Sequence, residues 1–162
     1  MQRLGQLIIG LICLALCACQ GTTFNSSVPR YPVNLVIDTR MGIFVHFKPE
    51  NTLSYVIANA EGLHYNGELV PRTVLEAYGY GGVLVYIDGW SNYNAWDLAC
   101  PYCAARGLKR VCEIDGIMAK CPDCGEEYDV GSGTAVPTKK ISHEYMRRIP
   151  LTNNGGVLVI RQ

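Results

Sequence analysis

The chain has 162 residues, of which 49% are hydrophobic and 17% charged, a composition typical of one globular domain and unlike that of a disordered or fibrous chain. Its 14 Lys and Arg balance 14 Asp and Glu to a net charge of zero, so it lacks the excess positive charge that favours nucleic acid binding. The 8 cysteines fall into one group before residue 20 and another after residue 99, which indicates two different chemistries.

The chain begins with an apolar run from Leu7 to Ala18 that follows Arg3. This run is too short to cross a bilayer as a helix and is typical of a secretory signal peptide. It ends in Leu16-Cys17-Ala18-Cys19, which resembles a bacterial lipobox. That resemblance implies a lipoprotein signal peptide over residues 1–18 and a lipid anchor on Cys19, whose several acyl chains would give stable membrane attachment. The alternative is an ordinary export signal in which Cys19 is incidental.

Residues 19–30 are small and polar after Cys19, so we expect them to form a flexible tether, with the folded domain at 31–162. Gln20 stands where an Asp retains lipoproteins in the inner membrane of enteric bacteria. By that resemblance the expected location is the cell envelope, lipid-anchored in the outer membrane and facing the periplasm.

The domain is expected to be all-β, an antiparallel sandwich or small barrel. Its apolar residues come in short, β-branched runs separated by Gly, Pro, Asn and Asp, which is typical of strands. These runs are 33–37, 42–47, 54–57, 83–87 and 157–160. Asn153-Asn154-Gly155-Gly156 predicts the turn of a closing hairpin. Two short windows, 70–77 and 142–148, are the only helix-like segments.

The second group of cysteines contains Cys100-Pro-Tyr-Cys103 and Cys121-Pro-Asp-Cys124-Gly125. Two C-x2-C pairs at this separation predict a metal site, because each tight turn aims two thiolates at one point. Gly125 stands where such a turn requires a positive φ or a close backbone approach. Four cations, Arg106, Lys109, Arg110 and Lys120, lie between the pairs in sequence and are available to offset the negative charge of four thiolates.

The sequence around these cysteines resembles the ligand boxes of Rieske iron–sulfur domains. The segment 94–101 is similar to the approach to the first box, and 121–133 is similar to the second, C-P-x-H-G-x-x-F-D-x-x-T-G. The ending 147–159 resembles the last hairpin of that fold. The resemblance implies antiparallel β-sheets with a small rubredoxin-like metal-binding subdomain at about 94–135.

The chain departs from that family at both ligand histidines, because Tyr102 and Cys124 stand in their places. His46, His64 and His143 are distant in sequence from the boxes and are interpreted as ordinary surface or strand residues. The ligand set would therefore be Cys100, Cys103, Cys121 and Cys124.

Three interpretations of this set stay open. Family resemblance implies a [2Fe–2S] cluster, whose four thiolates would give a low potential and an electron carrier. Symmetric C-x2-C pairs alone favour a closed tetrahedral zinc site, which is structural and typical of a binding or assembly module. In an oxidising compartment the thiols would instead pair as disulfides without metal. The Rieske-like residues around the cysteines slightly favour the [2Fe–2S] cluster.

Other motifs are weak. Cys112 lies in an alternating segment that would place its thiol near the site or bury it as a small apolar residue. Four aromatic residues, Trp90, Tyr93, Trp96 and Tyr102, are expected to pack in the core or over the metal site. The sequence lacks the nucleophile, metalloprotease and phosphate-loop motifs of common enzymes, so an enzyme is the least supported class. The expected partners are the membrane and an unidentified redox or assembly protein.

Overall fold

The computed structural model describes residues 25–139, 141 and 143–162. The predicted signal peptide and Cys19 lie outside the described residues. Within them, no helix is long and apolar enough to cross a membrane.

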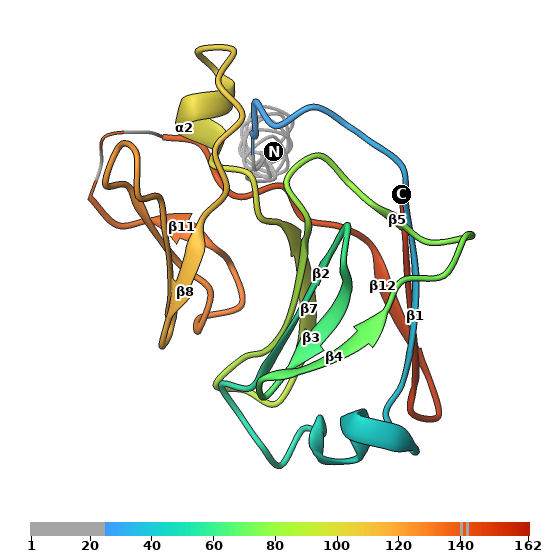
Figure 1. Ribbon diagram of the computed structural model, residues 1–162. Coiled ribbons are helices and arrows are strands. Elements are labelled where there is room, and N and C mark those ends of the chain that lie inside the picture. Colours follow the sequence, from blue (N-terminus) through green and yellow to red (C-terminus); the bar gives the residue numbers. More distant parts are fainter. Residues whose placement is uncertain (1–24, 140, 142) are drawn as a thin grey trace, which may run out of the picture.

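Three antiparallel sheets make up the described chain, which confirms the all-β prediction (Figure 1). The outer sheet has the order β12 (Leu151–Asn154), β13 (Val157–Arg161), β1 (Val33–Asp38) and β5 (Ala77–Tyr78). The middle sheet has the order β4 (Glu68–Pro71), β3 (Gly62–Tyr65), β2 (Tyr55–Asn59), β6 (Val83–Ile87) and β7 (Tyr93–Asp97). The small sheet has the order β11 (Val136–Pro137), β10 (Glu127–Asp129), β9 (Met118–Lys120) and β8 (Glu113–Asp115). Two short helices complete the fold, the 3-10 helix η1 (Gly42–His46) and α2 (Pro101–Ala104).

The three sheets are stacked in layers around strand β6, all of whose residues are fully buried. Side chains alternate across a strand, so its two faces meet different neighbours. Val83, Val85 and Ile87 belong to a first core shared with the outer sheet, whereas Leu84 and Tyr86 belong to a second core shared with the cysteines. The middle sheet is therefore sandwiched between the outer sheet and the small sheet (Figure 1).

The closing hairpin is confirmed. Strands β12 and β13 pair antiparallel, and Gly155 and Gly156 between them have φ of 62° and 92°. Strand β13 then pairs along β1, so the two ends of the domain lie side by side in one sheet. This pairing fixes the outer sheet.

The strand predicted at 42–47 is wrong, because these residues form η1. Gly42 has a φ of 61°, which is uncommon in an extended strand. Phe44 and Phe47 both enter the first core. Their spacing of three residues matches the period of a 3-10 turn and not the alternation of a strand.

The two helix-like windows are also not helical where the structure describes them. Residues 70–77 include the end of β4 and the start of β5, joined by a loop in which Val74 is 94% exposed. Residues 143–148 run beside β7, where Asp97 N donates to Arg147 O and Ile149 N to Ala95 O. Neither segment has a helical apolar stripe. Backbone pairing with neighbouring strands therefore determines their extended conformation.

Residues 25–30, assigned from sequence to the tether, pack on the domain. The Arg147 guanidinium donates to Val28 O at 2.5 Å and to Ser26 O at 2.9 Å. Ser27 donates from its backbone N–H and its hydroxyl to Glu144, and Val28 is fully buried. Residues assigned to the tether are therefore packed from the first described residue, Asn25, whose carbonyl accepts from Tyr145 N.

Candidate metal centre

The first cysteine pair is shaped by α2. Cys100 is the residue before the helix, and its carbonyl accepts from Ala104 N at 2.9 Å. Pro101 occupies the first helical turn, where its missing N–H costs nothing. The turn places Cys103 back beside Cys100, and both thiols are buried.

The second pair closes by a similar turn after β9. Cys121 O accepts from Gly125 N at 2.9 Å, and Cys121 N donates to Glu126 O. Gly125 has a φ of 73° and no atom within 4 Å of a hypothetical Cβ. The glycine is therefore required for its backbone conformation and not for space. Of the two reasons that the sequence allowed, the positive φ applies and the close approach does not.

The two turns bring four sulfurs together. The Sγ atoms of Cys100, Cys103, Cys121 and Cys124 all lie within 4.8 Å of one another. Cys100 Sγ lies 3.7 Å from Cys124 Sγ, and Cys103 Sγ lies 3.8 Å from Cys121 Sγ. These separations exceed a disulfide bond of about 2.05 Å, and the thiols are free.

These distances fit one ion between four thiolates. Sulfurs at about 2.3 Å from a tetrahedral ion lie about 3.8 Å from each other. The two measured pairs have that separation. The residues therefore match a metal centre in donor type, number and spacing.

Cys112 lies at the same site without belonging to the group of four. It is buried, and hydrogen bonding from its thiol is the main cause that lowers the pKa of Cys100 to about 4. The same interaction and burial raise the pKa of Cys112 itself. Cys112 therefore keeps its proton. It is buried in the same core as Cys100, so it lies near the site and also packs as a small buried residue.

Tyr128 is a site residue that the sequence reasoning missed. Its ring is fully buried under the cysteines, and its hydroxyl lies 3.5 Å from Cys100 Sγ. Burial, followed by the interaction with Cys100, raises the pKa of Tyr128, so the phenol keeps its proton and donates. An aromatic residue in the strand after the second cysteine pair was the available signal.

Burial raises the pKa of two further thiols of the group, Cys103 and Cys124. It raises that of Cys103, and it raises that of Cys124 to about 11, reinforced in each case by neighbouring thiols. In the metal-free domain, Cys100 is thus a thiolate, whereas Cys103 and Cys124 hold their protons at neutral pH. A metal ion must displace those protons to bind.

The four nearby cations pair at the rim of the site. Arg110 Nε lies 3.2 Å from Asp123 Oδ1, which joins the two cysteine turns. Lys120 lies 3.5 Å from Glu127. Arg106 stacks on Tyr102 with its Cζ 3.5 Å from the ring centroid, and Lys109 lies over Tyr80. Their charges surround the centre from exposed positions, where the effect of each is small.

Of the four aromatic residues, Trp96 and Tyr102 pack in the second core, whereas Tyr93 packs with Phe47 at the first and Trp90 is exposed. His64 lies beside Asn59 and Glu61. Among the described residues, the metal-ligating group contains cysteines alone and no histidine.

A buried carboxylate braces the approach to Cys100. Asp97 accepts from the backbone N–H groups of Tyr80, Gly81 and Ala99. Burial raises its pKa in spite of these bonds. Asp97 therefore fixes the loop 79–82 against the strand that leads into the first cysteine turn.

No protein-family model matches the chain, and no curated protein matches it. Solved structures that it resembles include a complex of reduced oxygenase and oxidized ferredoxin in carbazole 1,9a-dioxygenase, with 14% identity, a TM-score of 0.44 and coverage of 80% of this chain and 92% of that one. A second is a ferredoxin from Sphingomonas yanoikuyae B1, with 16% identity, a TM-score of 0.37 and coverage of 69% and 99%. A third is the ferredoxin of carbazole 1,9a-dioxygenase from Nocardioides aromaticivorans IC177, with 14% identity, a TM-score of 0.40 and coverage of 80% and 95%.

Proposed function

We propose that the domain binds one metal ion through Cys100, Cys103, Cys121 and Cys124, and that the ion is zinc in a structural role. The observation that carries this proposal is the spacing of the sulfurs, all within 4.8 Å of one another. Two sulfurs bound to one tetrahedral zinc lie about 3.8 Å apart, which is the separation of the Cys100–Cys124 and Cys103–Cys121 sulfurs. A binuclear cluster places its thiolates on two separate irons and needs a wider arrangement.

A closed site with four protein ligands leaves no position for substrate. The domain is then a non-enzymatic binding or assembly module, whose ion holds the two cysteine turns and the small sheet together.

The second candidate is a [2Fe–2S] electron carrier. It is favoured by the resemblance of 121–133 to a Rieske box, and by Cys124, the one ligand of the four that is partly exposed. An electron carrier needs a cluster close to the surface, and a cluster at this site would require the two turns to move apart.

We propose in addition that the chain is an exported lipoprotein with its lipid on Cys19, located in the outer membrane and facing the periplasm. The lipobox resemblance supports this proposal. The mass of the N-terminal peptide from the purified chain tests it, because a free or unprocessed N-terminus would contradict it.

Elemental analysis and a visible spectrum of the full chain, purified anaerobically, test the metal assignment. We expect one zinc per chain and a colourless protein. Two irons with acid-labile sulfide and a charge-transfer band would support the electron carrier in place of zinc. Metal-free protein with disulfides would contradict both.

Cys121→Ser tests the ligand set. This variant is expected to lose the bound metal. Cys112→Ser is the matched control, since it removes a buried thiol of the same core that lies outside the group of four, and it should keep full stoichiometry. Full metal content in Cys121→Ser would show that the ligand set is wrong.

A further inference from the structure

The loop that follows α2 is both basic and apolar. Residues 105–111 read Ala-Arg-Gly-Leu-Lys-Arg-Val, with three cations and no acidic residue, and all are exposed. Leu108 and Val111 are each 42% exposed. Exposed apolar side chains among Arg and Lys are typical of surfaces that meet lipid headgroups.

Aromatic rings extend this surface toward the first described residues. Lys109 Nζ lies 5.2 Å from the centroid of the Tyr80 ring, and the Tyr80 ring lies 5.2 Å from that of Tyr31, which is 51% exposed. Arg30 is exposed next to Tyr31. Tyrosine favours membrane interfaces because its ring is apolar and its hydroxyl is polar.

Two acidic side chains on the segments around this surface are already engaged. Asp123 pairs with Arg110, and Glu144 accepts from Ser27. Arg106 and Lys109 lie over tyrosine rings, an arrangement that leaves their charges available to an anionic surface.

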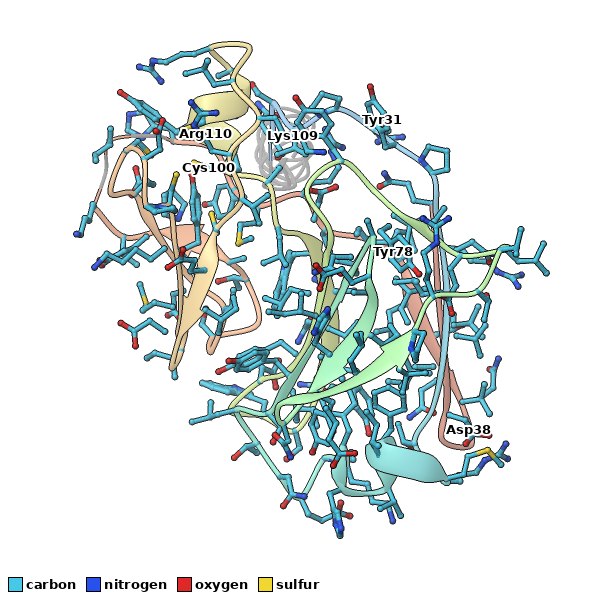
Figure 2. All side chains as sticks on the ribbon, in the orientation of Figure 1. Tyr31, Asp38, Tyr78, Cys100, Lys109 and Arg110 are labelled. Atoms are coloured by element: carbon cyan, nitrogen blue, oxygen red, sulfur yellow. The ribbon has the colours of Figure 1, made fainter. Side chains whose placement is uncertain are left out.

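The position of the first described residues points to the same end of the molecule. The segment 25–30, loop 105–111 and α2 lie together at one end, and η1 lies at the other (Figure 1). Figure 2 shows Tyr31, Cys100, Lys109 and Arg110 at that end and Asp38 at the opposite one. The chain from Cys19 to Asn25 reaches at most about 21 Å when fully extended.

We propose that this end of the domain, formed by loop 105–111 with Tyr31 and Tyr80, docks on a membrane surface that carries anionic phospholipid headgroups. The tether length rests on the proposed lipidation of Cys19, whereas the charge and apolar composition of the surface does not. Docking would turn the cysteine turns toward the bilayer and leave η1 and the β12–β13 turn facing away.

Amide hydrogen exchange on the full chain tests this proposal. The chain is reconstituted into nanodiscs of phosphatidylcholine alone or of phosphatidylcholine with phosphatidylglycerol. We expect exchange across 105–111 to slow at least threefold in the anionic discs, with no change across 39–48. Equal exchange in the two kinds of disc would overturn the proposal. A surface that binds a protein partner and not lipid would give this result.

Two matched triple variants assign the effect. Arg106→Gln, Leu108→Ser and Lys109→Gln together should abolish the slowing, and they leave the Arg110–Asp123 pair intact. Arg40→Gln, Met41→Ser and Lys48→Gln make the same kinds of change at the opposite end and should leave it intact. Slowing that survives the first variant, or that the second removes, would overturn the assignment.

Metal content and the mass of the N-terminal peptide are measured on the same samples. Slowing without zinc would contradict the metal proposal alone. If the N-terminus carries no lipid, the chain is added to the discs at lipid excess, and exchange across 105–111 still decides whether this surface docks.

Discussion

At Tyr128, a single buried hydroxyl supports a sulfur. The phenol lies 3.5 Å from Cys100 Sγ and keeps its proton because burial raises its pKa. A donor to a thiolate lowers the charge density of that ligand and fixes its orientation. The role of this residue is therefore to hold the ligand.

Tyr128→Phe removes this donor and keeps the ring. We expect metal affinity to fall about 10-fold, the lower end for lost partners of metal ligands. Competition with a chromophoric chelator measures the change. Tyr86→Phe is the control, because it removes a buried hydroxyl of the same core whose partner is Gly116 O and not a sulfur. Equal losses in both variants would attribute the effect to general destabilisation.

Metal affinity is also expected to depend on pH through individual thiols. Raised pKa values keep Cys103 and Cys124 protonated at neutral pH, the latter with a pKa of about 11, whereas Cys100, with a pKa of about 4, is already ionised. Binding must release the protons of the first two, so affinity rises with pH.

The protons of Cys103 and Cys124 alone contribute a rise of about 100-fold per pH unit between pH 6 and 8, about tenfold for each. The same chelator competition, repeated along this range, measures the slope. A slope below tenfold would contradict the assignment of both protons to these thiols.

Among the connecting elements, the loop 79–82 packs directly against the residue that precedes the first cysteine turn. A Cβ on Gly81 would lie 2.3 Å from Ala99 N, and Ala99 leads directly into Cys100. The Ala99 N–H is itself held by Asp97. The loop therefore cannot retreat from Ala99 without disturbing the three backbone bonds to Asp97.

Gly81→Ala is thus expected to destabilise the fold by about 2–3 kcal/mol, in the range of an overpacked core. Gly125→Ala should cost only about 1 kcal/mol, because its φ is positive but its surroundings are open. Chemical denaturation of both variants measures the difference. A larger loss at Gly125 would show that conformation outweighs contact here.

The sequence predicted four strands correctly because each is determined by its own local run of residues. The runs at 33–37, 54–57, 83–87 and 157–160 correspond to β1, β2, β6 and β13, since β-branched residues at strand length favour buried strands. The run at 42–47 has similar composition, yet the structure turns it into η1 to bury Phe44 and Phe47 together. That outcome depends on the core, which lies far away in sequence.

The site was predictable to the extent that its ligands are close in sequence. The C-x2-C spacing named four cysteines, and the structure brings their sulfurs together. Tyr128 and Cys112 reach the site through the pairing of β10 with β9 and through the bond from Cys112 N to Leu98 O. Such long-range pairings depend on the register between strands. That register cannot be predicted from the spacing of residues along the sequence.

At the scale of the whole molecule, two cores share the middle sheet but differ in what fills them. The first contains ordinary apolar side chains from the outer and middle sheets. The second includes all five described cysteines around short strands of two or three residues. Short strands alone contribute little stability, so the second core should depend on the metal.

Removal of the ion with a chelator is expected to loosen the second core first. Amide exchange across 100–137 should speed up by at least tenfold, while the β1–β13 pairing stays protected. The melting temperature should fall by more than about 5 °C, because a bound metal contributes directly to folding free energy. Uniform loosening of both cores would contradict this separation.

The hold of Arg147 on residues 26 and 28 has a mechanical consequence. Tension applied to the chain ahead of Asn25 is carried by the bonds of Ser26, Ser27 and Val28 to residues 144–147 before it reaches β1. Met146, between the residues that bear this force, packs in the cysteine core. Residues 26–28 are thus fastened to the half of the molecule that contains the cysteines, and the outer sheet is shielded from the pull.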